Sequence, residues 1–405
     1  MTVDGLPKEV ATHWAYLDNN ATTQPDPDVV RAMLTFLTQS FGNPSSGHDF
    51  GKAAAAALSI ARQQVAALIG AADDDEIVFT SGATEANNTA LVQALERGER
   101  SEVIVSAVEH AAILAVCADL ERYNGIKVHR IGVDGRGRLD IAAYRRTLSR
   151  RTALVSFMWA NNETGTLFPV AELAEMAHEA GALFHTDATQ AAGKIAIDLC
   201  ATKIDMLSLS AHKFHGPKGV GALYVRKGAP FRALLRGGRQ EHARRAGTEN
   251  IPAIVGLGVA AELARGRLFR EGPMIAKLRD RLERTILATI ENCFVLGDVS
   301  HRLPGTSAIA FDGADSEEIL VKLNAAGIAA SAGSACASGG VEPSHVLRAM
   351  HVPYAAAQGA VRFSLLRTNT DAEINRVIDA LQRIVAASRA CSPFPAQRRV
   401  ADAAE

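Results

Sequence analysis

Short apolar runs rich in β-branched residues alternate with amphipathic helical stretches through the first two-thirds of this chain. Within residues 170–181, for example, Val170, Leu173 and Ala177 fall on one face of a helix, and Gly181 stands where a C-cap is expected. Strands that alternate with helices predict a largely parallel sheet covered on both faces, with ligands bound beyond the carboxyl ends of the strands. The expected strands are residues 76–80, 102–106, 153–160, 182–186, 206–210 and 221–225.

The pattern changes near residue 260, where a long charged helical stretch leads into a smaller region of mixed helices and strands. A chain of 405 residues is long enough to bury two hydrophobic cores. We therefore predict an α/β fold in three parts: a large domain over residues 15–260, a smaller α/β domain over residues 261–390 with residues 1–14 packed on it, and a loosely ordered tail over residues 391–405.

Composition argues against several classes of partner. The 43 basic and 44 acidic side chains nearly cancel, which argues against nucleic acid or an anionic membrane as the main partner. We expect no secretion signal and no membrane span, because no basic segment precedes an apolar stretch at the N-terminus and no apolar run approaches about 18 residues. Five cysteines without a CxxC pair are typical of a cytoplasmic protein with reduced thiols. The 12 histidines show no paired metal-binding spacing, so no metal is expected.

Asp187 and Lys213 each stand at the end of an expected strand and point to pyridoxal phosphate. The aldehyde of this cofactor is held covalently by a lysine, and its ring nitrogen stays protonated opposite a buried carboxylate. Charged residues at the start of a loop are more often simply solvated. The functional interpretation of Asp187 and Lys213 therefore depends on the motifs around them.

The segment SGATEANN (81–88) follows an expected strand and opens a helix. Its small residues allow close approach of the backbone, and the helix start offers free N–H groups, so we place a phosphate at Ala83 and Thr84. The alternative is an ordinary capped helix with Thr84 as the N-cap. Ser210 and His212 flank Lys213 and could close the same phosphate site.

His110 also follows an expected strand. An imidazole at this edge of the sheet could stack on the cofactor ring and shuttle protons near neutral pH, although a single histidine is more often a structural residue.

Cys336 lies among Ser, Ala and Gly residues in SAGSACASGGVEPSH (331–345). These neighbours have little bulk to bury a thiol and suit an exposed loop, in which the thiol could act as a nucleophile. A free cysteine is usually a small buried hydrophobic residue, and Cys117 fits that description. Cys200, Cys293 and Cys391 carry no sign of reactivity.

Taken together, these motifs resemble the cysteine desulfurases, class V of the fold-type I pyridoxal-phosphate enzymes. The resemblance extends over about residues 14–390, and the segments 158–169 and 234–250 look most like the nitrogen-fixation NifS branch. The matching segments, in order, are YLDNNATT (16–23), FGNPSSGH (41–48), FTSGATEANN (79–88), VEH (108–110), ANNETG (160–165), HTDATQ (185–190), SAHK (210–213), RRAGTEN (244–250), SAGSAC (331–336) and VRFSL (361–365).

The resemblance implies a role for each matching residue. The cofactor would be bound by Lys213, by Asp187 at the ring nitrogen and by Gln190 near the phenolic oxygen. His110 would stack on the ring and serve as acid and base. Asn162 and Arg362 would position the substrate, with Arg362 gripping its carboxylate at two points. The phosphate would be bound by Ala83, Thr84, Ser210, His212 and, from the neighbouring subunit of a homodimer, Thr248.

The reaction implied by the resemblance converts L-cysteine to L-alanine and leaves a persulfide on Cys336. Sulfur would then pass to a scaffold protein that builds iron–sulfur clusters, with nitrogenase maturation as the expected role. Two departures from the family pattern, Ala332 and Ala337, concern the loop of Cys336 and not the reaction.

Other functions compete with this interpretation. A class-V aminotransferase shares the Asp187 and Lys213 chemistry but does not need Cys336, and a selenocysteine lyase has the same fold. A non-catalytic sulfur carrier would need no intact cofactor site, so the complete set of cofactor motifs argues against it.

Overall fold

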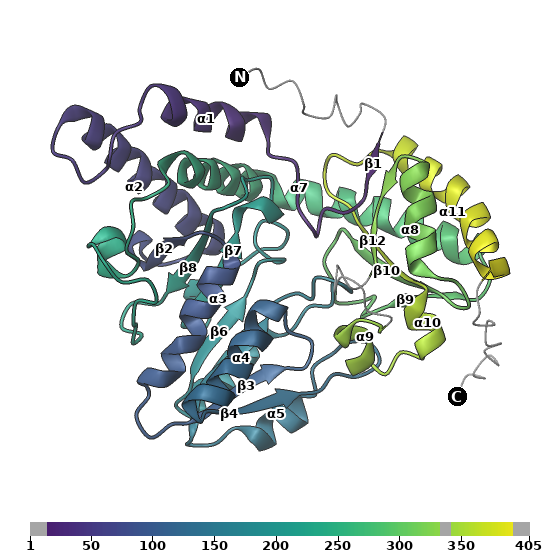
Figure 1. Ribbon diagram of the computed structural model, residues 1–405, viewed down its shortest axis with the longest axis horizontal. Coiled ribbons are helices and arrows are strands. Elements are labelled where there is room, and N and C mark those ends of the chain that lie inside the picture. The colour runs from purple at the N-terminus through teal and green to yellow at the C-terminus, as the bar shows by residue number, and fades with distance from the viewer. Residues whose placement is uncertain (1–13, 333–341, 392–405) are drawn as a thin grey trace. The chain divides into compact units, whose positions relative to one another are not determined.

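The computed structural model describes residues 14–332 and 342–391 (Figure 1). Its contacts divide the chain into a larger unit, residues 20–272 and 297–303, and a smaller unit formed by the remaining residues. The division falls at Gly272, inside helix α7 (Ile251–Thr289) and directly before its proline, Pro273. Residues 15–19 group with the smaller unit. The predicted packing of residues 1–14 and the predicted tail fall, but for Trp14 and Cys391, outside the described residues.

The larger unit is built on a seven-stranded sheet with the order β2-β8-β7-β6-β5-β3-β4. Neighbouring strands are parallel from β7 through β6, β5 and β3 to β4, whereas β8 is antiparallel to both β7 and β2. The predicted α/β class with a mostly parallel sheet is confirmed. The strands are β2 (Ile77–Thr80), β3 (Glu102–Ser106), β4 (Lys127–Ile131), β5 (Thr152–Met158), β6 (Leu183–Asp187), β7 (Met206–Ser210) and β8 (Gly221–Val225).

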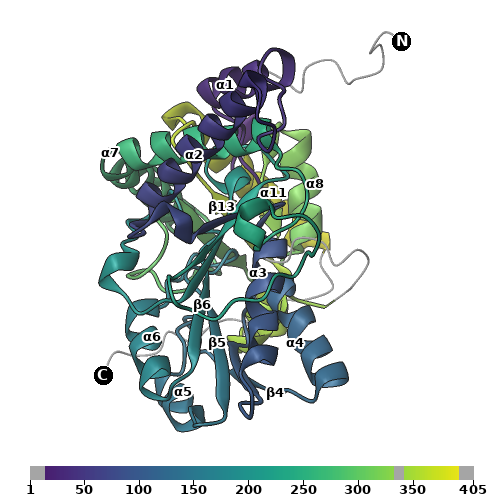
Figure 2. The ribbon, with the colours of Figure 1, turned by 90° about the vertical axis from the view of Figure 1, so that its left-hand side faces the viewer.

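Helices cover both faces of this sheet. Figure 2 shows α3 and α4 on one side of β5 and β6, and α5 and α6 on the other. On the α3–α4 side, Ala86, Ala90 and Ile113 pack with Val103 and Val105 of β3 in one buried cluster. The helices of the larger unit, besides the first part of α7, are α1 (Pro27–Thr38), α2 (Asp49–Ile69), α3 (Ala83–Leu91), α4 (Ala111–Asn124), α5 (Ile141–Thr147) and α6 (Val170–Glu179).

The smaller unit has its own core around a four-stranded antiparallel sheet with the order β12-β13-β10-β9. A short parallel pair, β1 (Ala15–Tyr16) with β11 (Ile328–Ala329), accompanies it. No helix among the described residues combines the length and apolar character needed to cross a membrane. The remaining elements are β9 (Cys293–Leu296), β10 (Thr306–Phe311), β12 (Ser331–Ala332), β13 (Ala360–Ser364), α8 (Ser316–Ala325), α9 (His345–Ala349), α10 (Tyr354–Gln358) and α11 (Asp371–Cys391).

Candidate active site

The direction of the strands brings the predicted polar residues of the larger unit to one edge of the sheet. Strands β3, β5, β6 and β7 are parallel, and β2 runs the same way because β8 is antiparallel to both β2 and β7. Their carboxyl ends therefore lie at a common edge, where ligands bind in such sheets. The residues at or just beyond these ends are Ala83, Thr84, His110, Asn162, Asp187, Gln190, Ser210, His212 and Lys213.

Lys213 ends a short 3₁₀ turn that directly follows β7. Its Nζ donates hydrogen bonds of 2.8 Å to the carbonyl oxygens of both Asn20 and Ala21. The amino group is therefore directed at the segment that begins the larger unit. This position, next to the end of β6 and its Asp187, suits a lysine that holds a cofactor.

Asn20 connects several of the predicted residues, although it carried no individual prediction. Its carbonyl oxygen also accepts a hydrogen bond of 2.9 Å from Gln190, and its Nδ2 donates to the carbonyl oxygen of Asn162. The buried Lys194 donates to Asn20 Oδ1 at 3.1 Å and to Gln190 Oε1 at 2.7 Å. The only sequence signal for Asn20 is its place in the motif YLDNNATT.

Asp187 is buried, and two N–H donors fix the orientation of its carboxylate. Asn87 Nδ2 on α3 donates to Oδ2 at 2.7 Å, and the backbone N–H of Thr189 donates to Oδ1 at 2.9 Å. The Oδ1 of Asn87 and the hydroxyl of Thr189 are themselves buried without a hydrogen-bond partner among the described residues. Buried polar atoms are rarely left unpaired, so this region fits a polar bound group.

The start of α3 fits a phosphate. Its N-cap is Gly82, which provides no side-chain cap, so the alternative with Thr84 as N-cap is wrong. Gly221 of β8 packs closely on Gly82: a Cβ added to Gly221 would lie 2.8 Å from the backbone of Gly82. A Cβ on Gly82 would lie 3.8 Å from the Oγ of Ser210. The first turn of α3 therefore combines uncapped N–H groups with a nearby hydroxyl, a combination that binds phosphate.

The two site histidines differ in their surroundings. Burial, and then the nearby charges of Lys213 and Lys218, lower the pKa of His212 to about 4, so its imidazole is neutral at physiological pH. His110 is the exposed N-cap of α4, and its Nδ1 accepts a hydrogen bond of 3.1 Å from the backbone N–H of Ala112. The neutral His110 imidazole therefore carries its proton on Nε2.

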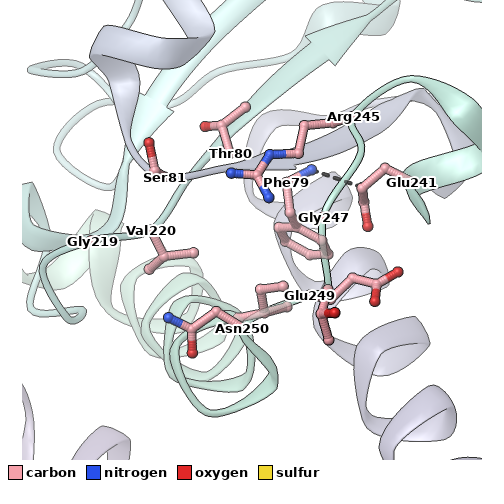
Figure 3. Close-up of a pocket in the computed structure, with 12 residues that line it drawn as sticks. Phe79, Thr80, Ser81, Gly219, Val220, Glu241, Arg245, Gly247, Glu249 and Asn250 are labelled. Atoms are coloured by element: carbon pink, nitrogen blue, oxygen red, sulfur yellow. Dashed lines mark hydrogen bonds between the residues drawn. The ribbon is translucent and has the colours of Figure 1, made fainter. Parts of the chain in front are cut away.

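Thr248 lies in an exposed loop that lines a cavity of about 210 Å³ (Figure 3). The same cavity is lined by Thr80 and Ser81 at the carboxyl end of β2. Arg245, in the same loop, pairs with Glu85 on α3 through hydrogen bonds of 2.9 and 3.1 Å. The loop is thus fastened to the helix whose first turn is the predicted phosphate site.

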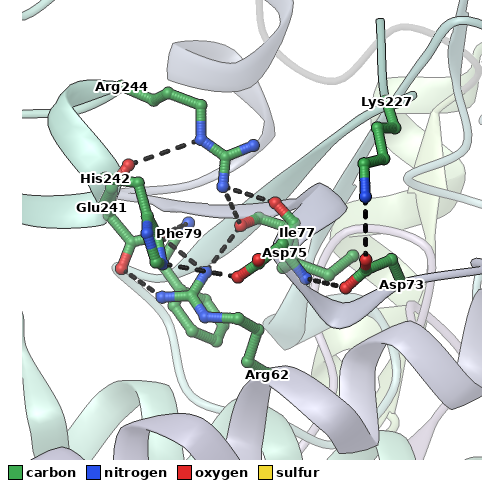
Figure 4. Close-up of polar contacts among 9 residues, drawn as sticks. All are labelled: Arg62, Asp73, Asp75, Ile77, Phe79, Lys227, Glu241, His242 and Arg244. Carbon is green, nitrogen blue, oxygen red and sulfur yellow. Dashed lines mark hydrogen bonds and ion pairs between the residues drawn. The ribbon is translucent and has the colours of Figure 1, made fainter.

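A left-handed turn precedes this loop (Figure 4). Glu241, His242 and Ala243 have φ values of 49°, 57° and 63°, a conformation that costs a non-glycine residue about 1–2 kcal/mol. The carboxylate of Glu241 is buried, forms two hydrogen bonds of 2.7 and 2.9 Å with Arg62, and accepts a third from the backbone of Phe79. This ion pair holds the turn in place, and sequence reasoning missed it because its partners lie 179 residues apart.

Arg362 belongs to the smaller unit. Arg362 lies on β13, is 2% exposed and donates a hydrogen bond of 2.7 Å to Asp18, with which it forms an ion pair. Cys336 and Ala337 lie outside the described residues, which end at Ala332 and resume at residue 342.

Cys117, in contrast, is fully buried on α4, and burial raises the pKa of its thiol to about 12. The interpretation of Cys117 as a small core residue is therefore confirmed.

Comparison with known proteins agrees with this geometry. Residues 15–377 match the aminotransferase class-V family, so the chain belongs to that family. It is 61% identical to a cysteine desulfurase of Gluconacetobacter diazotrophicus over 94% of this chain and 95% of the relative. It is 55% identical to the cysteine desulfurase NifS of Azotobacter vinelandii over 94% of each. A solved NifS-like protein superposes with a TM-score of 0.86 at 35% identity, covering 92% of this chain and all of that one.

Within the class-V family the chain therefore belongs to the cysteine desulfurases, which confirms the resemblance seen in the sequence. It is a pyridoxal-phosphate-dependent enzyme of fold type I.

Proposed function

We propose that this enzyme converts L-cysteine to L-alanine, holds the released sulfur as a persulfide on Cys336, and supplies it for iron–sulfur cluster assembly. The observation that carries the proposal is the common sheet edge at which Lys213, the buried Asp187 and the uncapped start of α3 occur together. A sulfur carrier without catalytic activity would not need these three features.

The cofactor is held at four points of the larger unit. Lys213 would bind its aldehyde, Asp187 its ring nitrogen and Gln190 its phenolic oxygen. When bound, pyridoxal phosphate supplies an electron sink that eases breakage of bonds next to the substrate's amino carbon. The phosphate would be bound by Ala83, Thr84, Ser210 and His212.

Two residues move protons during the reaction. Lys213 would, as a free amine, exchange a proton at the substrate's amino carbon. His110 uses Nε2 for proton transfer, because its Nδ1 is occupied by the N–H of Ala112. The Cys336 thiolate attacks the substrate sulfur, so that an S–S bond forms while the Cβ–S bond breaks. L-Cysteine and the enzyme thiol thus become L-alanine and the persulfide, with no further reactant.

Arg362 and Asn162 position the substrate. A guanidinium group matches a carboxylate with two parallel hydrogen bonds, and such bonds are strongest when the arginine is preorganised. The ion pair with Asp18 holds the buried Arg362 side chain in one orientation.

The enzyme acts as a homodimer in which Thr248 completes the phosphate site of the partner subunit. The exposure of Thr248 in the single chain supports this assignment. A second support is an apolar surface on α1, the segment that follows it and the start of α2, since large exposed apolar patches mark contact surfaces. Its residues, with their exposed fractions, are Val30 (43%), Leu34 (50%), Leu37 (60%), Phe41 (70%) and Phe50 (55%).

The sulfur acceptor is an iron–sulfur scaffold protein in the cytoplasm, and the dedicated role is nitrogenase maturation. Support comes from the similarity to NifS of Azotobacter vinelandii over nearly the whole chain. Normal growth on dinitrogen by a strain that lacks this gene would contradict the nitrogenase role.

Purified enzyme given L-cysteine and a reductant should form alanine and sulfide in equal amounts without any added 2-oxo acid. L-Serine, which has no sulfur to transfer, is the control substrate and should give no alanine. A requirement for a 2-oxo acid would show that the enzyme is an aminotransferase. Activity on selenocysteine but not on cysteine would identify a selenocysteine lyase.

A further inference from the structure

Glu109 is a fully buried carboxyl group directly before His110. Its Oε1 accepts a hydrogen bond of 2.7 Å from the hydroxyl of Ser106 and one of 2.9 Å from the backbone N–H of Met158. Ser106 ends β3 and Met158 ends β5, so Glu109 ties the loop that leads to His110 to the neighbouring strand. None of the roles proposed above uses this carboxyl group.

The strand that Glu109 contacts also borders Asp187. Met158 is the register partner of Asp187 across β5 and β6, and the N–H of Trp159 donates a hydrogen bond of 2.9 Å to the Asp187 carbonyl oxygen. A second tie, from Asn161 Nδ2 to the carbonyl oxygen of Val108, spans 3.3 Å. The loop before His110 and the strand end beside Asp187 are therefore joined by side-chain hydrogen bonds at two adjacent residues, Val108 and Glu109.

The surroundings of Glu109 favour its neutral form. Burial is the main cause that raises the pKa of Glu109, and the charge of Asp187 raises it further. The hydrogen bonds from Met158 and Ser106 lower this pKa, but by less, so its value is about 8. The other titratable groups nearby are Cys117 on α4, whose pKa is about 12, and His185 on β6, which interacts with Asp187 and whose pKa is about 4. Both are neutral near pH 7. Because the pKa of Glu109 is about 8, Glu109 is also mainly neutral there and adds no second negative charge beside Asp187.

We propose that Glu109 is a positioning residue. As a buried neutral carboxylic acid, it holds the loop of His110 against the strand end beside Asp187 through its hydrogen bonds. Two consequences follow for the cofactor, whose placement by Asp187 and His110 rests on the proposed function. Loss of the hydrogen bonds would displace His110. Ionisation of Glu109 would add a negative charge close to the Asp187 carboxylate and change the electrostatic environment of the ring.

Two substitutions separate these consequences. Glu109→Gln keeps an oxygen that can accept from Ser106 and Met158 but cannot ionise, whereas Glu109→Ala removes both hydrogen bonds. Glu102→Gln is the matched control, because Glu102 is also buried but lies at the opposite end of β3, where it pairs with His129 and Arg151. The readouts are the absorbance of the bound cofactor as a function of pH, and kcat and KM for alanine formation.

We expect Glu109→Gln to match the wild-type absorbance well below pH 8 and to diverge from it as pH rises through about 8, the value at which only the wild-type residue ionises. Glu109→Ala should lose about 10²-fold in kcat with little change in KM, as for a displaced catalytic group. Glu102→Gln should behave as the wild type throughout.

The proposal would be overturned if Glu109→Gln differed from the wild type equally at all pH values, or not at all. It would also be overturned if Glu109→Ala kept the wild-type kcat. Failure of the desulfurase function itself has a different signature, since wild-type enzyme would then form no alanine while the absorbance comparison would still report on Glu109.

Discussion

Replacing Lys213 by alanine should abolish alanine formation from L-cysteine, with a fall in kcat of at least about 10³-fold. The substitution removes both the covalent attachment of the cofactor and the amine that moves the substrate's proton. Loss of the yellow absorbance of the lysine-bound cofactor should accompany loss of turnover, and both are measured on the same sample. Lys203→Ala is a suitable control, because Lys203 is exposed and precedes β7, at the opposite end of the strand. A Lys213→Ala enzyme that kept its absorbance and turnover would refute the assignment.

A second large effect is expected from mixed dimers. Lys213→Ala and Thr248→Ala homodimers should both be nearly inactive, the latter because each cofactor site loses a phosphate contact. A heterodimer with one protomer of each kind should recover about half of the wild-type activity, because in a twofold dimer one of its two sites contains neither substitution. The measurement is alanine formation by heterodimers purified through two different affinity tags.

The reciprocal heterodimer is the control for this experiment. It pairs a wild-type protomer with one that carries both Lys213→Ala and Thr248→Ala. If Thr248 acts on the partner subunit, this heterodimer should be inactive, because each of its sites lacks one of the two residues. If Thr248 acts within its own subunit, this heterodimer should be half active and the first should show no recovery.

Much of the larger unit could be predicted from local patterns. Strands β7 and β8 have the expected bounds because each is a short, mainly apolar run followed by polar or small residues. Strand β4 was not predicted, since it lies at the edge of the sheet and its sequence KVHRI carries three basic or imidazole side chains. The helix expected to end near Gly181 ends at Glu179, with Gly181 in the left-handed conformation just beyond it.

The site residues also divide into those that a local sequence pattern reveals and those that it does not. Those that follow a strand, such as Asp187 and Lys213, could be found from the sequence because strand direction alone places them at one edge. Asn20 and the pair of Arg62 with Glu241 could not be found in this way, because their contacts join segments that are far apart in the chain. Glu109 was visible as a residue next to His110, but only its burial and its distance to Met158 reveal a neutral, hydrogen-bonded acid.

In the proposed reaction, sulfur leaves L-cysteine by attack of the Cys336 thiolate. The most direct measurement is alanine formed from L-cysteine under reductant by the wild type and by Cys336→Ala, with the cofactor absorbance of both recorded. We predict that the wild type forms alanine and that the variant keeps its yellow cofactor but forms none. Equal alanine formation by both proteins would rule out Cys336 as the nucleophile, because the sulfur would then leave without its thiol.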